Sequence, residues 1–385
     1  MTGQTPSMPL PVEAECFRIY RDVRDGFPER GLELGQGINE FPPAVMLVNV
    51  IAAIASDLHQ NARGRDYAGW PDDVLESACR SLIETHFGHD LPPGTRVLFT
   101  NGSSEGINLS IAALNDMGLS AMMPQPSYFV YEQSAIRYGV PLAGRYRRFR
   151  NTVVREQSGP YALVQAEPNP LDGTIAPLPD WARSDPDRRF DLLDTVFLLA
   201  QPDKLEGFNA QVRARVQRLN LTRGALLLTP SKDLSFPALR AGLVCTACPE
   251  LIAYIERDQY ARVFRPSPMI GYFCLFYLCV LRLFEAQCQG RFAAENDRLA
   301  RWLTDLGIGG GDPRPAVAGV GAPPFRINPH CAKPFFCFRP YGGPTLGGGG
   351  RGDISGFFVF SPLNLPIPSH ADLFRIPQDI RRAPR

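Results

Sequence analysis

One segment of the sequence combines the residue types that amine chemistry needs. Residues 229–243 read TPSKDLSFPALRAGL and follow a short apolar run, 225–228, that predicts a buried strand. Ligands of α/β proteins bind beyond the carboxyl ends of strands, where desolvation lowers the pKa of a lysine and makes its amine a nucleophile. Lys232 has this position, and Arg240, eight residues later, can neutralise a phosphate. The alternative is that Lys232 is a surface residue that begins a loop.

Lysine is rare in this chain. Of the 40 basic residues only three are lysines, Lys204, Lys232 and Lys333, and the others are arginines. Because arginine stays protonated in proteins, a reaction that needs a neutral amine has three candidates. Lys204 lies in a polar segment, and only Lys232 combines a preceding apolar strand with an arginine placed for a phosphate.

A second segment has the features of an anion site. Residues 100–107, TNGSSEGI, lie between a predicted strand, 96–100, and a predicted helix, 106–117. A helix N-terminus offers free N–H groups and a partial positive charge, which suit a phosphate. Ser103 and Ser104 are the candidate contacts, and the alternative is that one of them is an ordinary N-cap.

A carboxylate interrupts another apolar run. Asp194 lies in LLDTVF, residues 192–197, within a predicted strand, 192–198. A lone buried carboxylate is costly unless it is paired. We therefore expect Asp194 to have a partner.

These segments, in this order, resemble the pyridoxal 5'-phosphate (PLP) enzymes of fold type I, in the class I/II aminotransferase family. The SKD…P…R…G string is similar to that of 1-aminocyclopropane-1-carboxylate synthases. The resemblance implies that Lys232 forms the Schiff base with PLP and later removes the substrate Cα proton. It also implies that the cofactor contacts include Ser103, Ser104, Ser231 and Arg240.

Other motifs of this family have counterparts here. In PQPSYFVY, residues 124–131, Tyr128 would stack on the pyridine ring. In EPNPLDGT, residues 167–174, Asn169 would donate to the phenolic oxygen of PLP. Asp194 would pair with the protonated pyridine nitrogen, which keeps the ring an electron sink.

Three shorter matches concern the substrate and the subunit interface. Gly37, in LELGQG, resembles the glycine near the substrate carboxylate, and Tyr67, in RDYAGWP, resembles the tyrosine that reaches the phosphate of the neighbouring subunit. The latter implies a homodimer with active sites at the subunit interface. Arg375, in LFRIPQD, resembles the arginine that holds the substrate α-carboxylate, a role suited to its fork of donors, and Arg326 is a rival for it.

The alternation of apolar strands and helices predicts an α/β protein with a mostly parallel sheet covered on both faces. With 385 residues, the chain is long enough for a large and a smaller domain. By the resemblance, residues 1–44 form an N-terminal arm and part of the small domain, 45–284 the large PLP-binding domain, and 285–385 a C-terminal α+β small domain.

Composition argues against several other classes of protein. A net charge of +1 argues against a nucleic-acid binder that relies on bulk electrostatics. The longest apolar stretch, 269–281, has 13 residues, too few to span a membrane, and predicts a buried helix or part of a subunit interface. We find no targeting signal and expect a cytoplasmic protein. Cys245 and Cys248 have the spacing of a metal or redox pair, but no second pair accompanies them, which favours buried free thiols and no metal.

The expected reaction is PLP chemistry on an L-α-amino acid, with transamination as the first hypothesis. Phe197 departs from the family pattern, because aminotransferases usually have a tyrosine there, and arginine oxidases of the same family are similar to this Asp-Thr-x-Phe strand. The alternatives are therefore elimination or cyclisation, as in the cyclopropane synthases, and oxygen-dependent oxidation of an arginine-like substrate. A catalytically inactive binding relative is a further alternative.

Overall fold

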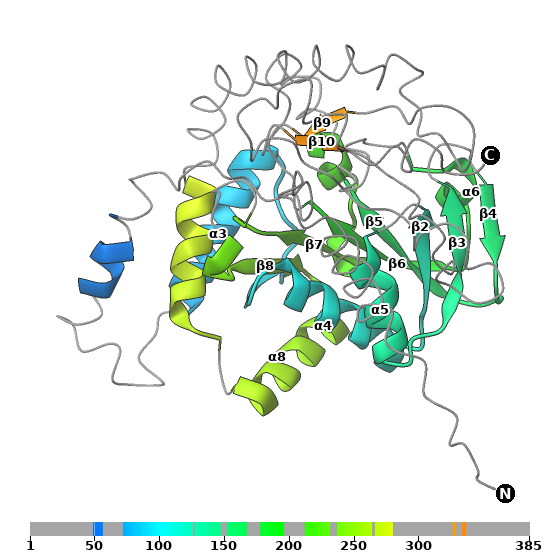
Figure 1. Cartoon of the computed structure of the whole chain (residues 1–385), viewed down its shortest axis with the longest axis horizontal. Coiled ribbons are helices and arrows are strands. Elements are labelled where there is room, and N and C mark those ends of the chain that lie inside the picture. Colours follow the sequence, from blue (N-terminus) through cyan, green and yellow to red (C-terminus); the bar gives the residue numbers. More distant parts are fainter. Residues whose placement is uncertain are drawn as a thin grey trace, which may run out of the picture.

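The structure is a computed structural model of the whole chain (Figure 1). It describes residues 49, 51–56, 72–125, 128–147, 152–167, 178–195, 212–231, 237–263, 266–279, 326–328 and 333–335. The α/β architecture expected from the sequence is confirmed.

An eight-stranded sheet forms the centre of the described part, in the order β1-β8-β7-β6-β5-β2-β3-β4. β8 is antiparallel to both of its neighbours and β4 is antiparallel to β3, while the other pairs are parallel. The strands are β1 (Arg96–Thr100), β2 (Ser120–Gln125), β3 (Leu142–Arg147), β4 (Thr152–Arg155), β5 (Tyr161–Ala166), β6 (Arg188–Asp194), β7 (Gly224–Leu228) and β8 (Gly242–Thr246). A separate antiparallel pair consists of β9 (Arg326–Asn328) and β10 (Lys333–Phe335).

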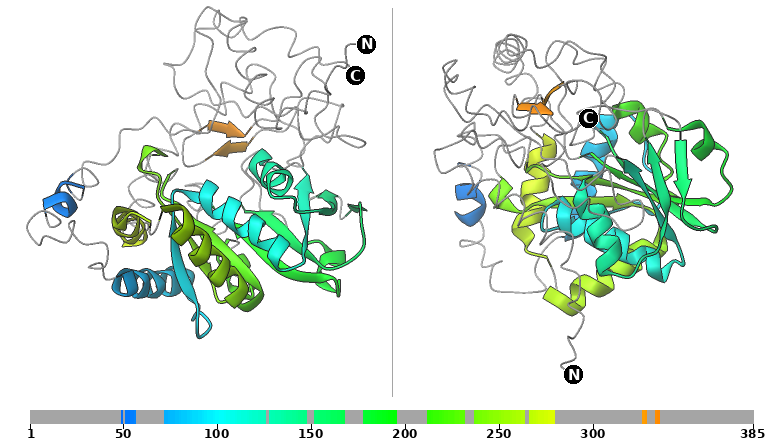
Figure 2. Two further views of the ribbon diagram at one scale, coloured as in Figure 1. Left: turned by 90° about the horizontal axis from the view of Figure 1, so that it is seen from below. Right: turned by 45° about the vertical axis from the view of Figure 1, so that its right-hand side comes forward.

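Helices cover both faces of the sheet (Figures 1 and 2). One apolar cluster lies under α4 (Ser103–Asp116), α5 (Phe129–Arg137) and α8 (Pro249–Val263). A second cluster lies on the opposite face, under α3 (Asp72–Phe87) and the helical residues 51–56, 212–217 and 268–279. Shorter elements are α6 (Asp180–Arg183) and the 3-10 turns η3 (Leu221–Arg223) and η4 (Pro237–Leu239). Because neighbouring residues of β7 face opposite sides, Leu226 joins one cluster and Leu227 the other.

Most predicted strands are confirmed. The start of one strand and the presence of one helix differ from the prediction. The strand predicted for 192–198 begins earlier, at Arg188. Arg188 and Asp191 form an ion pair with each other at 2.6 Å. Because their charges are paired, the polar first residues of this strand can also belong to the sheet. The helix α8 was not predicted, because it buries only a narrow stripe, Leu251, Ile255 and Gln259, and its other face is charged.

The apolar run at 269–281 is a buried helix as far as the described residues reach. Residues 268–279 are helical, and Cys274 and Tyr277 are fully buried in the cluster beside α3. Gly271 lies against Leu75 of α3, and the two helices run side by side in Figure 1. Within the described ranges, no helix has both the length and the apolar character that crossing a bilayer requires.

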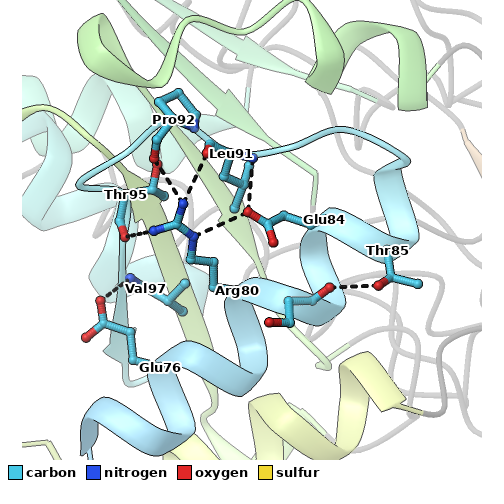
Figure 3. Close-up of polar contacts among 9 residues, drawn as sticks. Glu76, Arg80, Glu84, Thr85, Leu91, Pro92, Thr95 and Val97 are labelled. Carbon is cyan, nitrogen blue, oxygen red and sulfur yellow. Dashed lines mark hydrogen bonds and ion pairs between the residues drawn. The ribbon is translucent and has the colours of Figure 1, made fainter.

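The turn before β1 is held by one arginine of α3 (Figure 3). The Arg80 guanidinium donates to the backbone carbonyls of Leu91, Pro92 and Thr95, at 3.1, 3.2 and 3.4 Å. Its Nε donates to Glu84 Oε1 at 3.3 Å, and the same oxygen accepts the Leu91 N–H at 3.1 Å. This arrangement ties the start of β1, and hence the loop that follows it, to α3.

Replacing Arg80 by methionine is expected to lower the free energy of unfolding by about 2 kcal/mol, since the aliphatic stem is kept but several half-buried carbonyls lose a charged donor. Urea denaturation measures the change. Arg262→Met is the matched control, because Arg262 forms an exposed ion pair with Asp258 one turn away on α8, and its loss is expected to cost about 0.5 kcal/mol or less. Equal losses in the two variants would contradict the role given to Arg80.

Candidate functional site

The polar residues singled out in the sequence meet at one edge of the sheet. β1, β6 and β7 are parallel and end at this edge, at Thr100, Asp194 and Leu228. Asp194 lies opposite Leu227 of β7 and opposite Ala166 of β5. β8 runs in the opposite direction, with Gly242 opposite Thr100, so the residues before β8 also lie at this edge. The strand order therefore brings Arg240 to the loop that follows β1.

The geometry at the start of α4 suits an anion, and anion binding there remains a prediction. The N-cap is Gly102, with φ 78° and ψ 169°, and no side chain caps the helix there. The alternative in which Ser103 or Ser104 is the N-cap is therefore wrong, because these serines occupy the first helical positions. The first N–H groups of a helix have no acceptor inside the helix, so those of Ser103 and Ser104 suit an anion.

Arg240 lies directly against this helix start. Its Nη2 donates to the carbonyl of Asn101 at 3.3 Å, and the residue is exposed to solvent. A Cβ on Gly102 would lie 2.6 Å from Nη2, and a Cβ on Gly242 would lie 2.6 Å from the carbonyl carbon of Gly102. Both glycines are thus needed for close approach. A guanidinium and two helix N–H groups converge on one place, which is the donor set of a phosphate site.

One acidic side chain lies near this positive site. The Glu105 carboxylate accepts from the Asn101 backbone N–H at 2.6 Å and from its side-chain amide at 2.9 Å. These bonds hold the carboxylate back over the Asn101 loop. Its charge also interacts favourably with the helix N-terminus.

Replacing Gly102 by alanine is expected to weaken PLP binding about tenfold, since the new Cβ displaces the Arg240 guanidinium and a charge-assisted hydrogen bond to phosphate is worth roughly that factor or more. Titration of the apoprotein with PLP measures the effect. Gly118→Ala is the control at the other end of α4, because Gly118 also has a positive φ, 66°, but has nothing within 4 Å of its Cβ position. Both variants should lose about 1–3 kcal/mol of stability through backbone strain. An unchanged PLP affinity in Gly102→Ala would contradict the site.

The buried carboxylate has the partner that its burial requires. Asp194 is 3% exposed, and its Oδ2 accepts a hydrogen bond of 2.7 Å from the hydroxyl of Tyr131, which is fully buried on α5. Burial, and then the charge of Asp194, raise the pKa of Tyr131 well above its usual value of 10.0, so its hydroxyl keeps its proton. Sequence reasoning missed Tyr131, because 63 residues separate it from Asp194 and no local pattern connects them.

Tyr128 lies beside this pair. It is the residue before α5, is half-buried, and contacts the Tyr131 ring edge-on, with centroids 5.8 Å apart and planes at 84°. An aromatic ring at the edge of the sheet that bears Asp194 is suited to cover a planar heterocycle. Stacking by Tyr128 remains a prediction.

Ser231 is buried at the end of β7, where it joins β7 to the segment before β8. Thr229 Oγ1 donates to the Ala241 carbonyl at 2.7 Å and lies 2.8 Å from Ser231 Oγ. A hydroxyl has one hydrogen, so Thr229 gives its own to Ala241 and accepts that of Ser231. The Ser231 hydroxyl thus points its hydrogen at Thr229, and its contact with a cofactor remains a prediction.

Several predicted residues lie outside the part of the chain that the structure describes. They are Gly37, Tyr67, Asn169, Phe197, Lys232 and Arg375. Arg326 is described only as the first residue of β9. Lys232 is the residue that follows Ser231 in the sequence.

The interpretation of Cys245 and Cys248 as buried free thiols is confirmed, whereas Cys279, which is also free, is exposed. Cys245 and Cys248 are free and buried, and burial raises the pKa of Cys245 to about 12, which leaves its thiol inert. Among the described residues, no group of three or more acidic, histidine or cysteine side chains is placed to hold a metal ion.

Solved structures share this fold. The chain matches apo-BacF from Bacillus subtilis with a TM-score of 0.61 at 16% identity, over 80% of each chain. It matches an aspartate aminotransferase variant from Thermus thermophilus with a TM-score of 0.59 at 18% identity, over 80% of this chain and 82% of the other. For N-succinyldiaminopimelate aminotransferase from Mycobacterium tuberculosis the TM-score is 0.55 at 20% identity, over 79% of each. At these identities the likeness shows the fold of the PLP-dependent aminotransferases.

Sequence comparison points the same way. Nicotianamine aminotransferase 1 from Oryza sativa subsp. japonica is 28% identical over 130 residues, which are 33% of this chain and only 26% of the rice protein. The family model for aminotransferase class I and II matches residues 29–270, more than half of the chain. The chain therefore belongs to the class I and II aminotransferases, a family of transferases whose cofactor is pyridoxal 5'-phosphate.

Proposed function

We propose that this protein is a PLP-dependent aminotransferase that acts on an L-α-amino acid. The observation that carries the proposal is the placement, at one edge of the sheet, of the Arg240 guanidinium over Gly102 and of the buried Asp194 carboxylate. The first is a phosphate site and the second is an anionic partner for a ring nitrogen. PLP carries both groups on one small molecule.

The residues at this edge fit the cofactor. The start of α4 lacks a side-chain cap, and the missing Cβ at Gly102 lets the Arg240 guanidinium lie beside the first N–H groups of the helix, where a phosphate would be bound. A buried carboxylate does not stabilise an apolar core, so Asp194 is better suited to pair with a ring nitrogen. We assign the phosphate to Ser103, Ser104 and Arg240 and the pyridine nitrogen to Asp194. Tyr128 covers the ring.

Four residues outside the described ranges complete the proposed cofactor and substrate site. Lys232 holds PLP as a Schiff base, Asn169 donates to its phenolic oxygen, and Gly37 and Arg375 bind the substrate carboxylate. The support for them is the resemblance of their sequence motifs, and Gly37, Asn169 and Lys232 lie within the residues that the family model matches, 29–270. Arg326 is the rival of Arg375 for the carboxylate. Tyr67 would reach the phosphate of the neighbouring subunit, which makes the proposed enzyme a homodimer.

Proton movement is the task of the chain itself. When bound, PLP supplies an electron sink that stabilises negative charge at the substrate Cα. The amine of Lys232 would remove the substrate Cα proton as a general base and hold it on Nζ as an ammonium, which would then act as the general acid that gives the proton back. When PLP is bound, the Asp194 carboxylate would face the ring nitrogen and favour its protonated form. Arg375 would hold the carboxylate with its fork of donors and so orient the Cα–H bond.

Transamination is favoured over the alternatives by the family match and by the names of the relatives, which are aminotransferases. Phe197 favours elimination, cyclisation or oxygen-dependent oxidation, because the tyrosine usual at this position is missing. A catalytically inactive relative is disfavoured, because Asp194 and Arg240 keep the cofactor geometry. We also propose the division into a large domain, 45–284, and a small domain from 1–44 and 285–385.

The experiment is to load the purified protein with PLP and incubate it with single amino acids, with and without a 2-oxo acid. Mass spectrometry of the products tells the reactions apart. Transfer of an isotopically labelled amino group to the oxo acid is expected for transamination. Release of ammonia identifies elimination or oxidation, and a cyclised product that keeps its amino group excludes transamination. A protein that takes up no PLP would overturn the proposal.

A further inference from the structure

We propose that Tyr131 is a positioning residue that orients both the carboxylate of Asp194 and the ring of Tyr128. This inference rests on the proposed PLP function. Tyr131 donates its hydroxyl hydrogen to Asp194 Oδ2 at 2.7 Å, and its ring packs edge-on against Tyr128 at 5.8 Å. One side chain thereby orients the group proposed for the pyridine nitrogen and the group proposed for the ring face.

The hydrogen bond acts on the charge as well as the position of Asp194. A buried carboxylate is disfavoured in its ionised form, and a hydrogen bond donated to it favours that form. An ionised carboxylate accepts about four hydrogen bonds, so the bond from Tyr131 leaves acceptor capacity for a pyridinium. Since burial and the charge of Asp194 raise the pKa of Tyr131 well above 10.0, its hydroxyl stays protonated, and so a donor, at neutral pH.

The helix that carries Tyr131 is itself tied to the phosphate site. The side-chain amide of Asn108 donates to the Ser104 carbonyl at 2.7 Å, and its Oδ1 lies 2.9 Å from the hydroxyl of Ser134 on α5. Asn108 therefore bridges the start of α4 and the middle of α5. Because Asn108 holds α5 against α4, the position of Tyr131 on α5 is fixed relative to Ser103 and Ser104 at the start of α4. The spacing between the two anchor points of the cofactor is thus set by α4 and α5 together.

The test is Tyr131→Phe, which keeps the ring against Tyr128 and removes only the hydroxyl. Tyr146→Phe is the matched control, because Tyr146 is also buried, in a different apolar cluster from Tyr131. Its hydroxyl donates to the Val164 carbonyl at 3.0 Å. For each variant we would measure the PLP dissociation constant of the apoprotein and the pH midpoint of the visible absorbance of the PLP-loaded protein. The free energy of unfolding without PLP reports whether each variant is folded.

We expect Tyr131→Phe to raise the PLP dissociation constant about tenfold, the effect of losing a hydrogen bond to a charged group. The pH midpoint of the absorbance, which reports the pKa of the Schiff base, should move upward. Without the hydrogen bond from Tyr131, the Asp194 carboxylate would hold the proton on the ring nitrogen less firmly, and a less positive ring would lower the pKa of the Schiff base less. Tyr146→Phe should change neither, although both variants lose a similar amount of stability. In an Asp194→Ala background, the same change at Tyr131 should add little to either quantity.

Two results would overturn the inference. One is a Tyr131→Phe protein with the wild-type dissociation constant and pH midpoint. The other is an equal effect of Tyr131→Phe with and without Asp194, since a tyrosine that acts only on packing does not depend on the carboxylate. A wild-type protein that takes up no PLP would be a different outcome, because it would overturn the proposed function itself.

Discussion

Replacement of Lys232 by alanine is expected to abolish the visible absorbance that borohydride removes from the PLP-loaded wild type. The value of kcat/KM should fall at least about a thousandfold, because the variant loses both the Schiff-base amine and the general base for the Cα proton. PLP is still expected to bind noncovalently, through the start of α4 and Asp194. Absorbance spectra before and after reduction, together with steady-state kinetics, measure both effects.

The low lysine content makes this test unusually complete. Lys204→Ala and Lys333→Ala are the only other lysine-to-alanine variants that the chain allows, and both should keep the absorbance band and the activity. After reduction with borohydride, peptide mapping should find the cofactor on the peptide that contains Lys232. A reducible adduct that survives in Lys232→Ala would show that the Schiff-base lysine is one of the other two.

Replacement of Asp194 by asparagine is expected to lower kcat about a thousandfold while the protein remains folded. The amide keeps the size of the side chain but removes the negative charge that holds the ring nitrogen protonated, and electrostatic stabilisation of this kind is commonly worth about 10²–10³ in rate. The apoprotein should not become less stable through the lost charge, because a buried carboxylate contributes little net stability even when it is paired. Steady-state kinetics and urea denaturation measure the two quantities.

Asp191→Asn is the matched control on the same strand. Asp191 lies three residues before Asp194, makes an ion pair with Arg188, and belongs to no part of the proposed site. The variant is expected to lose some stability, about 1 kcal/mol for a half-buried pair, and to keep its kcat. A kcat of Asp194→Asn within threefold of the wild-type value would contradict the role given to Asp194.

Much of the fold could be predicted because local patterns determine it. β7 is a short run of apolar residues, all of them buried, and the sequence shows it without help from the structure. The carboxyl ends of β1 and β7, at Thr100 and Leu228, could also be predicted, whereas β6 ends at Asp194, inside the range 192–198 that the sequence predicts as a strand. α8 could not be predicted because it buries only a narrow stripe of residues. The first residues of β6 could not be predicted because they are charged and pair with each other.

The chemistry of the individual residues was thus readable from the sequence by itself: one lysine after a buried strand, a glycine and serine segment between a strand and a helix, and a carboxylate inside an apolar run. Only the tertiary structure decided which of them meet. β8 enters the sheet antiparallel between β1 and β7, and this direction alone puts Arg240 against Gly102, whose neighbour Asn101 is 139 residues away in the chain. Likewise, the packing of α5 on the sheet brings Tyr131 to Asp194. The physical reason is that strand order and direction follow from the packing of the whole core, whereas a hydrophobic pattern reports only which face of a segment is buried.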